Sequence, residues 1–195
     1  MNIDINLITQ LRNQTGAGIA DCKEVLTETN GDLEKAVELL RKKGAKIAGK
    51  RAEKEASEGI IYAYIHANNK VGAIIELNCE TDFVAKNESF KNLAHDLAMQ
   101  IVAQNPLYLS PEEIPEDVAN KEKEIYKDQL VAEGKPANMV DKIIEGKMNK
   151  WYEEVCLLKQ TFIKNEDITI EDLINEKIVG LGEKIKVGSF CRKEI

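Results

Sequence analysis

A change of hydrophobic period close to residue 80 limits the folds open to this chain more than any other feature. Before it, apolar residues alternate in the period of a half-buried β-strand: Val71, Ala73, Ile75, Leu77 and Cys79. After it, they form one unbroken helical stripe: Phe90, Leu93, Ala94, Leu97, Ala98, Ile101 and Val102. The sequence therefore predicts a mixed α and β core in which this helix lies across a sheet, with His95 off the stripe and solvated.

A β-hairpin is predicted just before this change of period. Residues 59–66 and 71–79 are rich in β-branched and aromatic side chains, and Asn68-Asn69 lies between them as a turn. Residues 184–191 also alternate and predict a last strand, which is able to extend the hairpin into a larger sheet.

The junction between strand and helix, residues 79–87, carries a bulky ring where turn residues are expected. The chain places Phe83 and Val84 between Asp82 and Lys86, although Gly, Pro, Asn and Ser are the usual residues of a turn. From this segment alone, packing of Phe83 into the local core is the favoured interpretation, because large apolar side chains are mostly buried. Presentation of the ring to a partner is the alternative.

Three short amphipathic helices are predicted over the first 44 residues. The first begins after Asp4 and ends at Gly16. The third begins after Asp32 and ends at Gly44. Three such helices cover one another's apolar faces, and their small core implies modest independent stability.

A basic stretch follows at residues 41–54, with seven basic residues, one acidic residue and no clear apolar face. We interpret it as a solvated linker that is helical in part; a basic contact surface for a partner is the alternative. Residues 44–50 have the spacing of a phosphate-binding loop, but Arg51 stands where Ser or Thr ligates magnesium and no strand precedes the loop. A nucleotide-binding loop is therefore rejected.

The remaining chain predicts a connection and further helices. Residues 106–117 hold three of the four prolines and interrupt regular structure. Helical patterns then run over residues 118–133 and 136–158; the first has few apolar positions and is expected to face solvent, while Trp151 in the second is expected to pack. Residues 169–172 resemble a capping box for one more short helix.

Charge and composition argue against several classes of protein. The net charge of −7 disfavours a protein that coats nucleic acid. No apolar run approaches the ~20 residues that span a bilayer, and the start of the chain lacks the pattern of a signal peptide, so we expect a cytoplasmic location. The four cysteines are too widely spaced for a CxxC metal site. We expect reduced, mostly buried thiols and no metal site; pairing of Cys191 across an oligomer is an alternative.

Catalytic motifs are also missing from the sequence. There is no Gly-x-Ser-x-Gly elbow, no His-Glu-x-x-His helix and no dinucleotide-binding glycine fingerprint. We therefore expect a protein that is not an enzyme and needs no cofactor. A chain with two ordered parts and Phe83 at a corner suits a protein that binds other proteins, which favours presentation of the ring.

Several stretches together resemble the signature sequences of the elongation factor Ts family. They are residues 15–18 (TGAG), 21–23 (DCK), 30–32 (NGD), 77–87 (LNCETDFVAKN), 134–136 (GKP) and 145–148 (EGKM). They cover nearly the whole chain in the expected order. The resemblance implies an α+β fold: a three-helix ubiquitin-associated-like domain at 1–44, a basic linker at 45–57, and at 58–195 an α+β dimerisation core with a small antiparallel sheet and packed helices.

The resemblance also implies a function in translation. Members of this family exchange the nucleotide of elongation factor Tu, which they bind in its GDP-bound and nucleotide-free forms. Thr81, Asp82, Phe83 and Val84 match the segment that promotes GDP release by dislodging magnesium, with Phe83 wedged between partner helices. Magnesium demands near-ideal octahedral coordination, so a small shift of its surroundings costs much of its binding.

Further contacts and the oligomer follow from the same resemblance. Arg12 matches a partner contact of the N-terminal domain, and Ile19 and Ala20 stand where many members have two Met. A single TDFV motif in 195 residues matches the short form, which implies a homodimer, with an uncovered sheet edge as the means of association. The ending, residues 187–195, is shorter and less arginine-rich than usual. No direct contact with nucleic acid or membrane is implied.

Two other functions stay open from the sequence. One is a ubiquitin-associated-like adaptor that binds proteins without exchanging a nucleotide. The other is an RNA-binding translation protein that uses residues 41–54, which the acidic total makes the weaker of the two.

Overall fold

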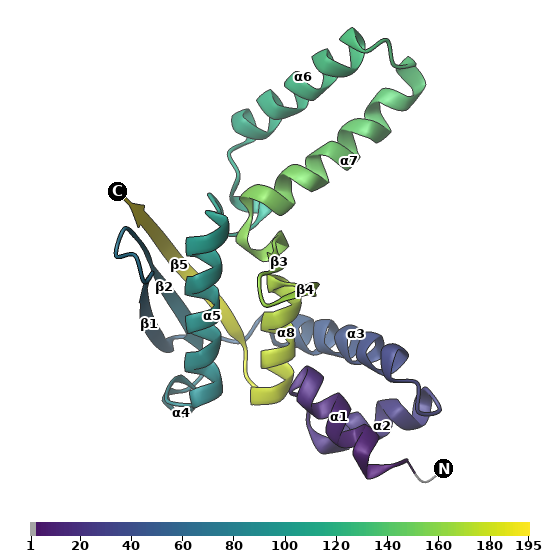
Figure 1. The fold of residues 1–195 in the computed structure, drawn as a ribbon, viewed down its shortest axis with the longest axis vertical. Helices are drawn as coiled ribbons and strands as arrows, with labels where there is room; N and C mark the ends of the chain where they lie inside the picture. The colour runs from purple at the N-terminus through teal and green to yellow at the C-terminus, as the bar shows by residue number, and fades with distance from the viewer. Residues whose placement is uncertain (1–2) are drawn as a thin grey trace. The chain divides into compact units, whose positions relative to one another are not determined.

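The computed structural model describes residues 3–195, apart from the side chains of residues 137 and 138. The chain forms two compact units. The first holds the chain up to Met99 together with Glu171–Ile195, and the second holds Gln100–Ile170. Helices and antiparallel strands both contribute, which confirms the α+β class (Figure 1).

Three helices occupy the N-terminal part of the first unit: α1 (Ile5–Thr15), α2 (Ile19–Glu28) and α3 (Leu33–Arg51). The Asp4 carboxylate accepts a hydrogen bond from Asn6 N and begins α1, and Gly16 ends it at a φ of 67°. The shared core consists of Ile8, Leu11, Ala17, Cys22, Val25, Leu26, Ala36 and Leu40. The three predicted helices are therefore present, with their apolar faces turned toward one another.

Helix α3 is longer than the sequence indicated. The expected end at Gly44 is wrong, because the helix continues through the basic stretch to Arg51. Gly44 is buried inside α3, and a Cβ at this position would lie 3.4 Å from the Val179 side chain. The glycine permits a close approach and is not a helix end. The division into domains at residues 44 and 57 stays a prediction.

A three-stranded antiparallel sheet completes the first unit, in the order β1 (Glu58–Ile65), β2 (Val71–Cys79) and β5 (Ile185–Glu194). The predicted hairpin and its extension by the last strand are both confirmed. Strand β2 lies in the middle, and its register with β5 shifts between Glu76 and Leu77. One face of β2 is buried, through Ala73, Ile75, Leu77 and Cys79.

Helix α5 (Glu88–Gln104) lies across the sheet, as Figure 1 shows. Its stripe is buried as predicted; Phe90, Leu93 and Leu97 have no exposed surface. His95 is not simply solvated. Its Nδ1 lies 3.1 Å from Tyr62 Oη, and its ring packs edge-on against Tyr62 and Tyr64 of β1. The helical pattern does not predict this contact, because the partners of His95 are aromatic rings on a strand.

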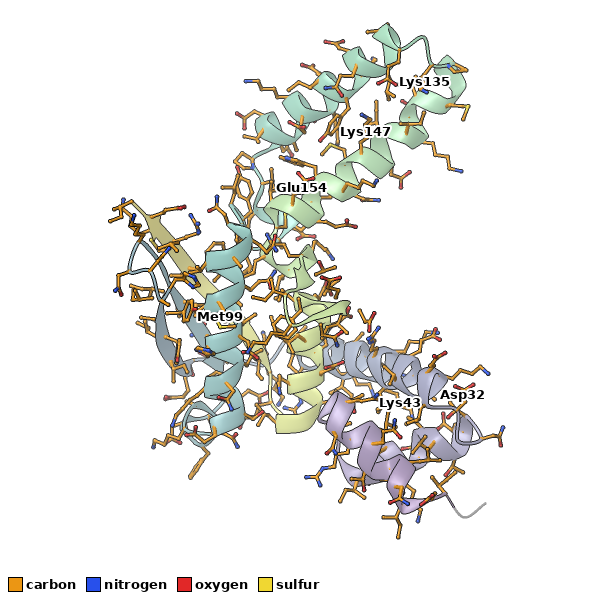
Figure 2. All side chains as sticks on the ribbon, viewed as in Figure 1. Asp32, Lys43, Met99, Lys135, Lys147 and Glu154 are labelled. Atoms are coloured by element: carbon orange, nitrogen blue, oxygen red, sulfur yellow. The ribbon has the colours of Figure 1, made fainter. Side chains whose placement is uncertain are left out.

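The second unit contains a helical hairpin and short connecting elements. Helices α6 (Glu116–Ala132) and α7 (Ala137–Val155) run side by side, with Lys147 of α7 over the Tyr126 ring of α6 at 5.2 Å (Figures 1 and 2). Most of α6 faces solvent, as expected, and Trp151 is half-buried. The remaining elements are η1 (Pro111–Glu113), η2 (Leu157–Lys159), β3 (Thr161–Phe162), β4 (Asn165–Thr169) and α8 (Ile170–Leu181), whose later residues return to the first unit.

No helix of residues 3–195 combines the length and apolar character that a membrane crossing requires.

Candidate partner-binding site

Phe83 is presented to solvent at a corner of the first unit. It lies in α4 (Asp82–Ala85), one turn of helix that follows β2, and 81% of its surface is exposed. Ala85 of the same turn is buried and Val84 is half-buried. The interpretation of Phe83 as local core is therefore wrong. The turn is attached through Ala85 while the aromatic ring projects away from it.

The two charged residues beside Phe83 pair with each other. Lys86 Nζ lies 2.6 Å from Asp82 Oδ2, one helical turn away. This hydrogen bond lowers the pKa of the Asp82 carboxyl below its ordinary value. The Lys86 and Asp82 side chains are 75% and 49% exposed, so the pair adds little to stability. In the free chain Asp82 therefore has a local partner, Lys86.

Two carboxylates hold the backbone that leads into α4. Glu183 accepts hydrogen bonds from the backbone N–H groups of Glu80 and Thr81 and from the Thr81 hydroxyl. Glu80 accepts from Lys184 N at 2.6 Å and from Arg51 Nη1 at 2.8 Å. The backbone N–H of Lys184 is the largest cause of a lowered pKa at Glu80. The segment that carries Phe83 is thus fixed at its base.

No local sequence pattern predicts that Glu183 and Arg51 support the Phe83 segment. Glu183 follows Thr81 by 102 positions, and only the pairing of Cys79 with Ile185 between β2 and β5 brings the two together. Arg51 was interpreted as part of a solvated stretch. The only sequence signal for Glu183 is its position directly before the predicted last strand, which places it in a turn at the end of the sheet.

Arg12, Ile19 and Ala20 are exposed on α1 and α2. Ile19 keeps 59% of its surface in solvent, which is high for a large apolar side chain. Within the described residues, no hydrogen bond, ion pair or ring contact joins the three to Thr81–Val84. Arg12, Ile19 and Ala20 are thus exposed without a bond to the Phe83 turn, and the role of both groups toward a partner stays a prediction.

Three of the seven basic residues in the basic stretch pair with the chain's own acidic residues. Lys42 binds Glu38, Lys43 binds Glu24 and Glu28, and Arg51 binds Glu80, at 2.7 to 3.2 Å. These acids reduce the positive charge that a nucleic acid would meet along α3, which disfavours the RNA-binding hypothesis.

Part of the outward face of the sheet carries exposed apolar side chains, beside the polar Glu76 and Asn78. Ile61, Ile65 and Ile74 are 77%, 61% and 52% exposed. A hollow of about 270 Å³ lies over Ile65, Ile74 and Cys191. Cys191 is an exposed free thiol, whereas Cys22, Cys79 and Cys156 are buried. Exposed apolar side chains that lie together on one face are typical of an interaction surface.

Metal-binding chemistry has no visible basis in the described part of the chain. No group of three or more His, Cys, Asp and Glu side chains able to hold a metal ion occurs among residues 3–195.

Comparison with known proteins gives a single result over nearly the full length. The family model described as "Elongation factor TS" matches residues 5–195. The protein named elongation factor Ts of Syntrophus aciditrophicus (strain SB) is 56% identical over 195 residues, which is 100% of this chain and 97% of that protein. The one from Moorella thermoacetica is 57% identical over 96% of this chain and 93% of its own. The one from Thermotoga maritima is 52% identical over 100% and 97%.

Proposed function

This chain belongs to the elongation factor Ts family of translation factors, and on that premise we propose that it binds elongation factor Tu and promotes the release of bound GDP, so that GTP takes its place. It does so in the cytoplasm by binding alone, with no reaction of its own and no direct contact with nucleic acid. The observation that carries the proposal is the exposed ring of Phe83, within the segment that the family resemblance assigns to this task.

The energetics of Phe83 favour a partner. Burying a Phe side chain is worth about 1.5–3 kcal/mol relative to leaving it in water. In the free chain most of that free energy is unused, because the ring is 81% exposed. Entry of the ring between two helices of elongation factor Tu recovers it. A buried aromatic side chain of this kind is a frequent hot spot of protein interfaces.

Displacement of magnesium is the proposed route to GDP release. Magnesium requires near-ideal octahedral geometry and bridges phosphate oxygens, so a small shift of the surrounding protein weakens its binding. In this proposal Thr81–Val84 causes that shift when Phe83 enters the partner. Nucleotide and exchange factor then weaken each other's binding by the same factor, as thermodynamic linkage requires.

The first expected result is faster release of GDP. Elongation factor Tu loaded with a fluorescent GDP analogue should lose it at least about a hundredfold faster when this chain is present, because a coupling of ~3 kcal/mol corresponds to that factor. Stopped-flow fluorescence measures the rate against a chase of unlabelled GDP. A complex that forms without faster release would support the adaptor hypothesis and contradict ours.

A second expected result concerns the N-terminal domain. We propose that Arg12, Ile19 and Ala20 grip the partner. Ile19→Ala should raise the half-saturating concentration about fivefold and leave the maximal release rate unchanged, since most interface residues contribute about 1 kcal/mol or less. Ile5→Ala is the matched control, because Ile5 is an exposed isoleucine of the same three-helix region. Equal effects of both substitutions would contradict a specific contact at Ile19.

We further propose that two copies of this chain associate through the outward face of their sheets. The chain has one Phe83 segment, and three exposed isoleucines, Ile61, Ile65 and Ile74, lie on that face. Ile74→Asp should raise the dimer dissociation constant by about a hundredfold or more, because burying an unpaired charge is costly. Sedimentation equilibrium measures the association. Leu107→Asp, another exposed apolar residue, is the control that should stay dimeric.

A further inference from the structure

A reciprocal set of hydrogen bonds joins the loop before α4 to the loop before β5. Glu183 Oε2 lies 3.1 Å from Glu80 N and 3.0 Å from Thr81 N, and Glu183 Oε1 lies 2.6 Å from Thr81 Oγ1. In return, Glu80 Oε1 accepts from Lys184 N at 2.6 Å. We call Glu80, Thr81, Glu183 and Lys184 the two-loop network. Each loop gives one carboxylate to the backbone of the other.

The two-loop network lies directly beyond the last pair of the sheet. The ladder between β2 and β5 ends at Cys79 and Ile185, so the backbone N–H groups of Glu80 and Thr81 have no strand partner there. Glu183 satisfies both of them with one ionised group. Hydrogen bonds to a carboxylate are stronger than those between neutral groups, and removal of the acceptor leaves the donors unpaired in a half-buried site.

Thr81 transmits this constraint to Phe83. It is the N-cap of α4, with extended backbone angles of φ −132° and ψ 155°. Its own capping bond, accepted from Val84 N, is long, at 3.4 Å, whereas its hydroxyl donates to Glu183 at 2.6 Å. A helix of four residues has too few internal hydrogen bonds to fix its own direction. The direction of the Phe83 ring therefore depends on the backbone of Thr81 at one end of the turn, as it does on the buried Ala85 at the other.

We propose that Glu183 is a positioning residue for nucleotide exchange, acting through Thr81 to hold Phe83 in the direction in which it enters the partner. The inference rests on the proposed function. A ring that is already oriented loses little conformational freedom when it is buried, whereas a loose turn must be ordered at that moment. Glu183 touches neither partner nor nucleotide in this account. Its contribution is made in the free protein.

The first test separates positioning from general stability. GDP release from elongation factor Tu is measured against the concentration of each variant. Glu183→Ala should lower the maximal release rate about tenfold, equivalent to ~1.4 kcal/mol, and change the half-saturating concentration less than about twofold. Glu183→Gln keeps one acceptor oxygen and should fall between wild type and Glu183→Ala. Glu166→Ala, an exposed change of the same charge on β4, should behave as wild type.

A double-mutant cycle tests whether Glu183 acts through the ring. In a Phe83→Ala background, the further change Glu183→Ala should lower the maximal rate by less than about twofold, because the ring that it positions is gone. An undiminished tenfold loss would overturn the inference, since the two effects would then be independent. So would an unaltered rate for Glu183→Ala beside an impaired Phe83→Ala. If Phe83→Ala released GDP at the wild-type rate, the proposed role of the ring would fail first, and this inference with it.

A measurement on the free protein needs no partner. Amide hydrogen exchange by NMR should be at least about tenfold faster at Glu80 and Thr81 in Glu183→Ala, because both N–H groups lose their acceptor. The amide of Ile75, within the β2 ladder, should keep its protection and thereby show that the sheet is intact. An unchanged rate of amide hydrogen exchange at Thr81 would overturn the inference, even if Glu183→Ala no longer promoted GDP release.

Discussion

Replacement of Phe83 by alanine is expected to lower the maximal rate of GDP release from elongation factor Tu by about 30- to 1,000-fold. A buried aromatic hot spot is worth about 2–4 kcal/mol, and each ~1.4 kcal/mol corresponds to a factor of ten. The ring is 81% exposed in the free chain, so its removal leaves the fold intact. Stopped-flow release of a fluorescent GDP analogue at saturating concentrations of the variant measures the loss.

Two companion variants make the result for Phe83 specific. Phe83→Tyr keeps the ring and should retain most of the activity, whereas Phe83→Leu keeps an apolar side chain without the ring's reach and should be intermediate. Lys86→Ala removes the local partner of Asp82 but not the ring, and should have a smaller effect than Phe83→Ala. Wild-type rates for Phe83→Ala would rule out the ring as the wedge.

The second large effect is on stability. Phe90→Ala should lower the free energy of unfolding by about 3–5 kcal/mol, because Phe90 has no exposed surface and its loss leaves a cavity. Such a loss is a large part of the ~5–15 kcal/mol that holds an ordinary domain together. Urea unfolding followed by circular dichroism, together with amide exchange at Ile75 of β2, reports the change in the first unit. The exchange measurement is needed because a chain of two units need not unfold in one step.

Phe83→Ala is the matched control for Phe90→Ala. Each change removes a phenyl ring, and the two positions are seven residues apart. Phe83 is exposed, whereas Phe90 is buried. The control should change the free energy of unfolding by less than about 0.5 kcal/mol, as exposed substitutions usually do. A destabilisation of several kcal/mol at Phe83 would mean that the ring packs in solution, and would contradict its role at an interface.

Much of the fold was available from periodicity alone. The stripe that begins at Phe90 predicted α5, and the alternation over β2 predicted the buried face that this helix covers. Both patterns are local and are imposed by burial on one side, so they can be read without knowledge of the rest of the fold. The final strand was equally visible, because β5 alternates in the same way.

Other features depend on contacts that no window of sequence contains. The prediction that a helix ends at Gly44 is wrong, because a glycine that ends a helix and one that permits close packing look identical in a sequence. The pairing of His95 with two tyrosines and the support of Thr81 by Glu183 both join residues from distant elements. The segment around Phe83 alone favoured a buried ring, and only the rest of the chain favoured the exposure that the structure shows, while the role of the ring stays a prediction.

The topology of the sheet also has a consequence for the order of events during synthesis. Strand β5 is made after every other described element, yet it pairs along the full length of β2, from Val71 with Glu194 to Cys79 with Ile185. Until then the ribosome carries a chain in which β2 is an unpaired edge on that side and the Phe83 turn has no support from Glu183. Closing so long a loop is entropically slow compared with forming a local hairpin. Competence for exchange should therefore be among the last properties that a newly made chain acquires.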